Sequence, residues 1–381
     1  MKTPSRARHR IAAMVRKEFI QISRDKRSLG ILIFLPVFML IMFGYALTFD
    51  VSESPLSVLD EDKTPASRAL IEALYQTDFF GPGPQVNNTH EAEWLLDSRK
   101  ATSVIIIPSG YSADLLAKRR APVQILIDGS NANEATLIKT YIEQIVGSVN
   151  QEIRQDFLNS RGMHLDLPLD IRARIWYNPE LKSSVYLVPG LVVYILMITA
   201  VISTAVSVVR ERERRTLEQL MISPLRPIEL IIGKTLPYLL ISIVAAYAIL
   251  TFGYILFGAT VKGSHIELFF VLILFLIGGL ALGLVVSTVA PNQQVAFLAA
   301  TFISVLPTLL LSGFMFPLES MHPVLQGISM IFPARYFLES LRFIVIKGAD
   351  ISAYWHDVLA LFIFLLVMVN VARIKLNSIF R

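Results

Sequence analysis

The stretch VVRERERRTLEQLMISPLRPIELIIGKTLPYLL, residues 208–240, joins two strongly apolar runs of the sequence. It places six charged side chains in succession from Arg210 to Arg215, continues with an apolar patch, and is then interrupted by two prolines. Proline ends one helix and can begin the next. The pattern predicts a short helix over 210–221 with a charged rim and an apolar tip formed by Leu217, Leu220 and Met221. A solvated linker needs neither feature, so we interpret the segment as a surface that docks into a partner and carries force into its two apolar neighbours.

The composition is that of a membrane protein. Of 381 residues, 54% are hydrophobic and only 17% are charged, which is too apolar for an ordinary soluble chain. Six runs are long enough to cross a bilayer as helices. They cover residues 29–49, 185–209, 235–257, 266–290, 294–314 and 352–372. The first run is followed by no small-x-small cleavage motif, so we expect a retained anchor.

The distribution of Lys and Arg predicts the orientation. Nine of them precede the first run, in residues 1–28, and six lie in the loop 210–234. Because basic loops stay in the cytoplasm, we expect both ends of this sequence and that loop to face the cytoplasm, and residues 50–183 to lie outside. The basic residues flank the predicted spans and do not alternate with aromatic residues, so the net charge of +5 does not indicate nucleic-acid binding.

Two further segments are expected at the membrane surface. In residues 1–28, Ile11, Val15, Phe19 and Ile22 fall near one helical face, which predicts an amphipathic helix on the inner leaflet. The alternative is a basic tail without structure. Residues 315–351 are apolar but broken by prolines, and we expect short interfacial helices in an outer re-entrant segment.

Residues 50–183 are long enough for one domain. Short apolar runs alternate there with helical patterns, which is typical of a mixed α/β fold. We expect strands at 55–60, 84–88, 102–108, 123–128 and 171–177, and helices at 65–76, 91–99, 112–118 and 134–160. The predicted fold class is an α-helical polytopic membrane protein with six transmembrane helices, the last five within residues 184–381, plus this extracytoplasmic domain.

No catalytic or metal site is predicted. A phosphate-binding loop around Gly233-Lys234-Thr235 would need glycine at position 228, where Ile228 stands. The sequence has no cysteine, and its six histidines are scattered. We therefore expect no ATPase site, no enzyme activity and no cofactor in this chain. The predicted span interiors also lack Asp, Glu, Lys and Arg, which disfavours a proton-driven carrier.

A small-residue face is present at Gly279-x-x-x-Gly283. Small residues at this spacing allow two helices to approach closely. The contact could lie within the chain or between two copies of it, and the sequence leaves both open.

Three segments together carry a family resemblance. RERERRTLEQLMISPLRPIELIIGK, residues 210–234, resembles the coupling segment of the type-2 ABC transporter permeases, in which E-R-E-x-G-T-x-E-x-L precedes a proline-containing turn and Gly-Lys. Arg215 stands where that family often has glycine. RKEFIQISRDKRSL, residues 16–29, resembles its N-terminal interfacial helix, and residues 312–342 resemble its outer re-entrant segment. The large region after the first span matches a subgroup common among bacterial multidrug-type exporters.

This resemblance implies the permease subunit of an ATP-driven exporter in a bacterial inner membrane. The apolar spans suit a lipophilic or amphipathic substrate, although the family also moves polymers and ions. Two permeases, the second a copy or a paralogue, would join two separate ABC ATPase subunits that bind ATP, and a periplasmic adaptor could contact the external domain. The residues expected to couple the permease to the ATPase are Arg210, Glu211, Glu213, Arg214, Thr216, Leu217, Glu218, Leu220 and Met221. The alternative function is a non-transporting membrane scaffold or receptor that presents its α/β domain outside.

Overall fold

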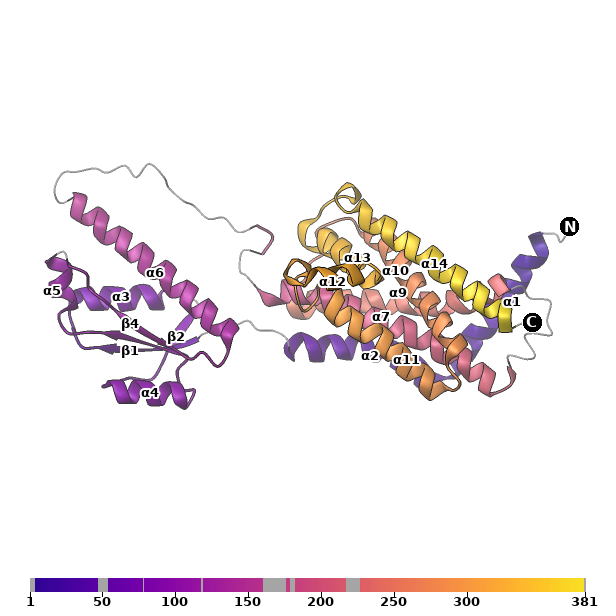
Figure 1. Cartoon of the computed structure of the whole chain (residues 1–381), viewed down its shortest axis with the longest axis horizontal. Coiled ribbons are helices and arrows are strands. Elements are labelled where there is room, and N and C mark those ends of the chain that lie inside the picture. The colour runs from indigo at the N-terminus through magenta and orange to yellow at the C-terminus, as the bar shows by residue number, and fades with distance from the viewer. Residues whose placement is uncertain are drawn as a thin grey trace. The chain divides into compact units, whose positions relative to one another are not determined.

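A computed structural model describes residues 4–46, 54–77, 79–117, 119–159, 176–178, 182–216 and 227–379. The chain divides into two compact units (Figure 1). A helical unit contains residues 1–48 and 174–381, and a smaller unit contains residues 49–173. Each unit has its own hydrophobic core, so each is described by itself.

Long helices make up the helical unit. They are α1 (Pro4–Arg24), α2 (Lys26–Ala46), α7 (Ser183–Glu213), α9 (Pro227–Phe257), α10 (His265–Val289), α11 (Gln293–Leu311) and α14 (Trp355–Ile379). Within the described residues, the last five of these are long and apolar enough to cross a membrane, which is the pattern of a polytopic membrane protein. The remaining predicted span, 29–49, corresponds to α2, whose apolar stretch covers Leu32–Ala46. Residues 47–49 lie outside the described part of the chain.

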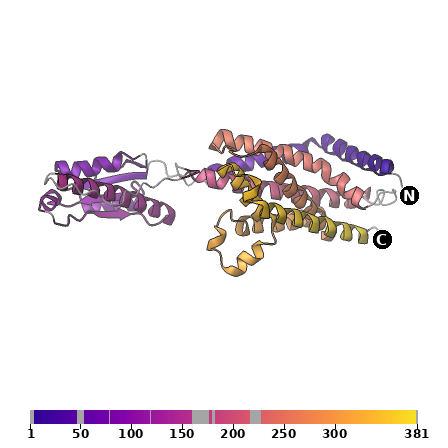
Figure 2. The same ribbon diagram turned by 90° about the horizontal axis from the view of Figure 1, so that it is seen from above.

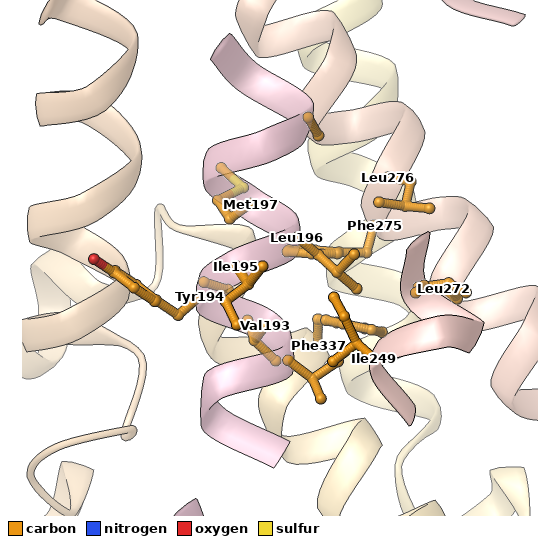
Figure 3. Close-up of a cluster of buried hydrophobic side chains, with 14 of the residues drawn as sticks. Val193, Tyr194, Ile195, Leu196, Met197, Ile249, Leu272, Phe275, Leu276 and Phe337 are labelled. Atoms are coloured by element: carbon orange, nitrogen blue, oxygen red, sulfur yellow. The ribbon is translucent and has the colours of Figure 1, made fainter. Parts of the chain in front are cut away.

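The core of the helical unit forms around α7. This helix is apolar on all sides, and a helix with that pattern is buried by its neighbours. Figure 3 shows its middle turns facing α9, α10 and α13. Phe275 and Phe337 stack there with ring centroids 4.1 Å apart. The labelled side chains are Val193, Tyr194, Ile195, Leu196, Met197, Ile249, Leu272, Phe275, Leu276 and Phe337.

Glycines set the closest helix approaches. A Cβ atom on Gly283 would lie 2.5 Å from the carbonyl oxygen of Val201, and one on Gly279 would lie 3.3 Å from the Cβ of Ala200. Both glycines of the Gly-x-x-x-Gly pattern therefore pack against α7 of the same chain. At the start of α7, a methyl group on Gly190 would overlap the buried ring of Phe314.

Residues 315–351 form short helical pieces, as the sequence predicted. They lie at the end of the bundle opposite the start of α1 and the end of α14 (Figures 1 and 2). The pieces are η1 (Leu318–Ser320), α12 (Pro323–Ser329), α13 (Pro333–Arg342) and the π-helical turn η2 (Phe343–Lys347), followed by η3 (Ile351–Ala353). Helix α13 packs against α7, α10 and α14, so this end of the bundle shares the core that forms around α7.

The smaller unit is built on a four-stranded sheet. Its strands are β1 (Ser54–Asp60), β2 (Phe80–Pro82), β3 (Ser103–Ile107) and β4 (Gln124–Ile127), in the order β2-β1-β3-β4. β1 is parallel to β2 and β3, and β4 is antiparallel to β3. The helices are α3 (Pro65–Tyr75), α4 (Thr89–Asp97), α5 (Tyr111–Leu116) and α6 (Ala132–Asn159).

Helices cover both faces of this sheet (Figure 1). Ile105 and Ile107 of β3 join a core with α3 and α6, whereas Val104 and Ile106 join a core with α4. All five residues of β3 are buried, which explains why the four that follow Ser103 are all apolar.

Two strand predictions need comment. The strand expected at 84–88 was wrong, because the pairing strand is β2 at Phe80–Pro82. This strand lies at the edge of the sheet, where a proline without an N–H donor is tolerated. Residues 171–175 of the strand expected at 171–177 lie outside the described residues.

Candidate functional site

The charged stretch begins as the last turn of α7, which runs without interruption from Ser183 to Glu213. The prediction of one separate helix over 210–221 is therefore wrong at its start. No helix-breaking residue separates the apolar run from the charges, so the membrane helix continues through them. Helix α7 ends because Arg215 adopts a left-handed backbone conformation with φ of 55°. That conformation at a helix end favours glycine, the residue expected at this position from the family resemblance.

A buried ionic cluster joins α7 to α1 and α9. Its members are Lys17 and Glu18 of α1, Glu211 of α7 and Lys234 of α9, and their two positive and two negative charges balance. The Nζ atom of Lys234 lies 2.8 Å from Glu211 Oε2 and 3.3 Å from Glu18 Oε1. Lys17 Nζ lies 3.1 Å from Glu18 Oε1 and also pairs with Glu211. The side chains of Glu18, Glu211 and Lys234 are only 1–3% exposed, whereas that of Lys17 is 40% exposed.

Gly233 explains how Lys234 becomes buried. A Cβ atom on Gly233 would lie 2.5 Å from Cγ of Met14, so the absent side chain lets α1 lie directly on α9. Met14, Glu18 and Ile22 form the buried face of α1, whereas Phe19 of the predicted apolar face is 37% exposed. The face of α1 that meets the protein is therefore partly ionic.

Two more ion pairs hold α1 in place. Arg10 of α1 pairs with Glu229 at the start of α9, with Nε 2.9 Å from Oε2. Asp25, just after α1, lies 3.2 Å from Arg210 of α7. With the buried cluster, α1 has charged contacts near its beginning, its middle and its end, so α1, α7 and α9 form one connected body at this end of the bundle.

The opposite side of the same α7 turn contacts α10 and α11. Arg212 donates to the carbonyl oxygens of Ser287, at 3.4 Å, and Ala290. Glu213 accepts a hydrogen bond of 2.9 Å from the backbone N–H of Gln293 and another from its side-chain amide. The turn from Arg210 to Glu213 is thus held from two sides.

A small cavity lies beside this junction. It has a volume of about 210 Å³ and lies among α1, α2, α7, α9 and α11. Its walls are mainly apolar, and the Asp25–Arg210 pair supplies charge at one side. The lining residues include Ile22, Leu32, Ile202, Tyr238 and Phe297.

The predicted site residues are only partly brought together. Arg210, Glu211 and Glu213 contact other parts of this chain, and Thr216 donates from Oγ1 to the Glu211 carbonyl oxygen at 3.1 Å. Arg214 is exposed. The remaining predicted residues, Leu217, Glu218, Leu220 and Met221, lie outside the described residues. A contact between this segment and an ATPase therefore stays a prediction.

Sequence reasoning missed Lys17, Glu18, Glu229 and Lys234. It started the third span at residue 235, but α9 begins at Pro227, so the helix includes Glu229 and Lys234. The expectation that the span interiors lack ionisable residues concerned residues 235–257 of this helix and stays a prediction, because Glu229 and Lys234 lie in the part of α9 that precedes them. The signal was present, because a lysine next to a long apolar run is expected to find a partner. Among the described residues, no group of three or more His, Cys, Asp or Glu side chains could hold a metal ion.

Comparisons with known proteins cover nearly the whole chain. The family described as "ABC-2 family transporter protein" matches residues 26–374. The chain is 30% identical over 349 residues to the "Probable multidrug ABC transporter permease YbhR" of Escherichia coli K12, which covers 92% of this chain and 93% of the relative. It is also 30% identical to the "Probable multidrug ABC transporter permease YbhS" of the same organism, with 91% of each chain covered. The "Inner membrane transport permease YhhJ" is 25% identical, again with 91% of each chain covered.

Proposed function

Because the chain belongs to the ABC-2 family of transporter proteins, as the transmembrane permease subunit of an ABC exporter, we propose that a separate ABC ATPase drives it through the segment 210–221. ATP is bound and hydrolysed on the partner, and this chain has no enzyme activity of its own. The apolar tip formed by Leu217, Leu220 and Met221 docks into the ATPase. Movement of the ATPase then reaches α7 and α9, the helices on either side of the segment.

The buried ionic cluster is the observation that carries this proposal. It lies on the helices that adjoin the segment, and it joins them to α1 by charged contacts within the protein. A buried ion pair is favourable only while its charged groups stay close together in good geometry. Helices joined by such pairs therefore move together. A force applied at the segment would therefore move α1, α7 and α9 as one body.

The proposed topology has six spans, with α2 as the first. The start of α1, the segment 210–221 and the end of α14 face the cytoplasm, and residues 50–183 form an α/β domain outside. The sequence has no cysteine, so single cysteines can report the topology. In intact cells, an impermeant thiol reagent should label Ser130→Cys and leave Ser223→Cys unlabelled. The reverse labelling pattern would refute the topology.

The proposed substrate is lipophilic or amphipathic. The cavity beside Asp25 and Arg210 has mainly apolar walls and one charged pair, which suits a molecule with both kinds of surface. Export should require ATP and should persist when an uncoupler collapses the proton gradient while ATP is maintained. A second permease, either a copy or a paralogue, completes the transporter, and the external domain offers a contact for a periplasmic adaptor.

The docking role of the segment can be tested directly. Burial of one leucine contributes roughly 1.5–3 kcal/mol, and about 1.4 kcal/mol corresponds to a tenfold change in affinity. The double change Leu217→Ala and Leu220→Ala should therefore reduce ATPase recovery on the affinity-tagged permease at least tenfold. Glu218→Lys should reduce transport in vesicles, because it reverses a charge at the same surface.

A matched leucine pair in the smaller unit provides the control. Leu116→Ala combined with Leu137→Ala changes two exposed leucines far along the sequence from the segment. This variant should retain ATPase binding and transport. If the Leu217→Ala, Leu220→Ala variant retains both as well, the segment is only a linker.

A further inference from the structure

A second cavity, of about 330 Å³, lies at the end of the bundle that carries α12 and α13 (Figure 1). It is enclosed by the start of α7, the turn after α11, η1, α13 and η2. Three basic side chains line it, together with aromatic and aliphatic groups. The lining residues used below are Tyr186, Leu318, Arg335, Leu338, Arg342 and Lys347.

Both arginines have an unused buried donor. Arg342 donates from Nη1 to the Gly313 carbonyl oxygen at 3.1 Å, and its guanidinium lies 3.9 Å from the ring centroid of Tyr186. Arg335 donates from Nη1 to the Gln326 carbonyl oxygen at 3.1 Å. Within the described part of the chain, the buried Nε atoms of Arg335 and Arg342 have no hydrogen-bond partner. A buried N–H donor without an acceptor costs free energy, so a small movement of either guanidinium toward an acceptor in the cavity would be favourable.

The charge inside the cavity is positive. Glu319 and Glu339 also line it, but both are exposed, whereas Arg342 is half-buried. Burial lowers the pKa of Arg342 below its usual value, despite the raising effect of Tyr186 and the two glutamates. Lys347 lies at the rim, with Nζ 4.1 Å from the ring centroid of Phe343. Three positive and two negative side chains leave one uncompensated positive charge.

We propose that this cavity binds the phosphate group of an amphipathic lipid. Guanidinium groups match phosphate oxygens in geometry and charge, and Arg335 and Arg342 both line the cavity. Leu318 and Leu338 supply an apolar wall for the start of the hydrocarbon portion. The site goes beyond the proposed transport function, because it is a binding site whose test requires neither ATP nor movement of substrate.

Binding is measured on the purified full chain in detergent. Three probes are titrated by calorimetry: dihexanoyl phosphatidylglycerol, inorganic phosphate and octyl glucoside, which has a chain but no phosphate. Of the three probes, we expect only the phospholipid to bind well. Arg342→Gln should weaken phospholipid binding about tenfold or more, since a charge-assisted hydrogen bond is lost. Lys347→Gln should weaken it severalfold. Lys262→Gln, a lysine that lines a different cavity, should leave it unchanged.

Lys347 keeps the test decisive if Arg342→Gln does not fold, because Lys347 is exposed and its removal leaves the core intact. Equal binding of the phospholipid by the unmodified chain and Lys347→Gln would overturn the proposal. Octyl glucoside binding as tightly as the phospholipid would do so too, because the phosphate would then play no part. Inorganic phosphate binding as tightly would assign the site to free phosphate and overturn the lipid assignment.

Discussion

Lys234 offers the sharpest test of the buried ionic cluster. Replacing it by methionine keeps a long side chain and removes one positive charge. Glu18 and Glu211 would then share only Lys17, whose side chain is 40% exposed. Removing one partner of a buried ion pair costs about 3–5 kcal/mol, because a charge stays buried without compensation. We expect Lys234→Met to destabilise the folded chain by roughly that free energy.

A second change should reverse part of this loss. Glu18→Gln added to Lys234→Met leaves one lysine and one glutamate, so the cluster is neutral again. The double variant should therefore be more stable than Lys234→Met alone. Lys139→Met provides the control, since Lys139 pairs at 3.8 Å with a glutamate one helical turn away and both side chains are 67% exposed. A surface pair of this kind contributes about 0–1 kcal/mol.

The assay is thermal unfolding of the purified permease in one detergent at neutral pH, with the three variants compared against the unmodified chain. Two results would each refute the reasoning. One is a loss of stability for Lys234→Met no larger than for Lys139→Met. The other is a double variant that is no more stable than Lys234→Met alone. Either pattern would mean that the four charges are not held together in a buried neutral group.

Three other predictions follow from the backbone and the caps. Arg215→Gly should stabilise the chain by about 0.5–1 kcal/mol in thermal unfolding, because glycine adopts the left-handed conformation without strain, and Arg214→Gly should not. Gly190→Ala should destabilise it, since the methyl group overlaps a buried phenylalanine, whereas Gly147→Ala should stabilise a helix position with open space around it. The Asp62 carboxylate accepts hydrogen bonds from a threonine hydroxyl and from backbone N–H groups, and these bonds lower its pKa. The ionised carboxylate therefore stabilises the folded chain at pH values above the usual pKa of 3.8, and this stabilisation is lost as pH falls through the lowered pKa. Asp62→Asn should therefore be less stable than the unmodified chain at pH 7, with the difference shrinking below pH 3.8.

Local sequence patterns predicted the helices well. Length and apolarity identified the hydrophobic helices α7, α9, α10, α11 and α14, because both properties belong to one continuous stretch. In the smaller unit, each helix was expected within a few residues of where it lies. Strand β2 was missed because three residues that include a proline carry no alternation. Its position depends on pairing with β1, which lies more than twenty residues earlier in the sequence.

The end of α7 was harder to predict. The six consecutive charges suggested a new element, but charge alone does not end a helix, and arginine and glutamate are good helix formers. The change of direction comes at Arg215, where the backbone is left-handed although the residue is not glycine. A sequence rule that expects glycine at such positions therefore finds no signal here. The replacement of the family's usual glycine by Arg215 drew attention to this position. The positive φ angle of Arg215 became visible only in the structure.

The ionic cluster depends on contacts that no local pattern contains. Lys234 and Glu18 are 216 positions apart, and they meet only because α1 lies directly on α9. Read along the sequence, Lys234 is an ordinary basic residue at the edge of an apolar run. Once α1 is in place, the pair Gly233-Lys234 has a clear physical meaning. The glycine admits Met14, and the lysine neutralises the carboxylates that α1 and α7 bring into the protein. The same pair had suggested a phosphate-binding loop, but its glycine contacts a methionine side chain and its lysine is enclosed by glutamates, so neither residue is available to a nucleotide.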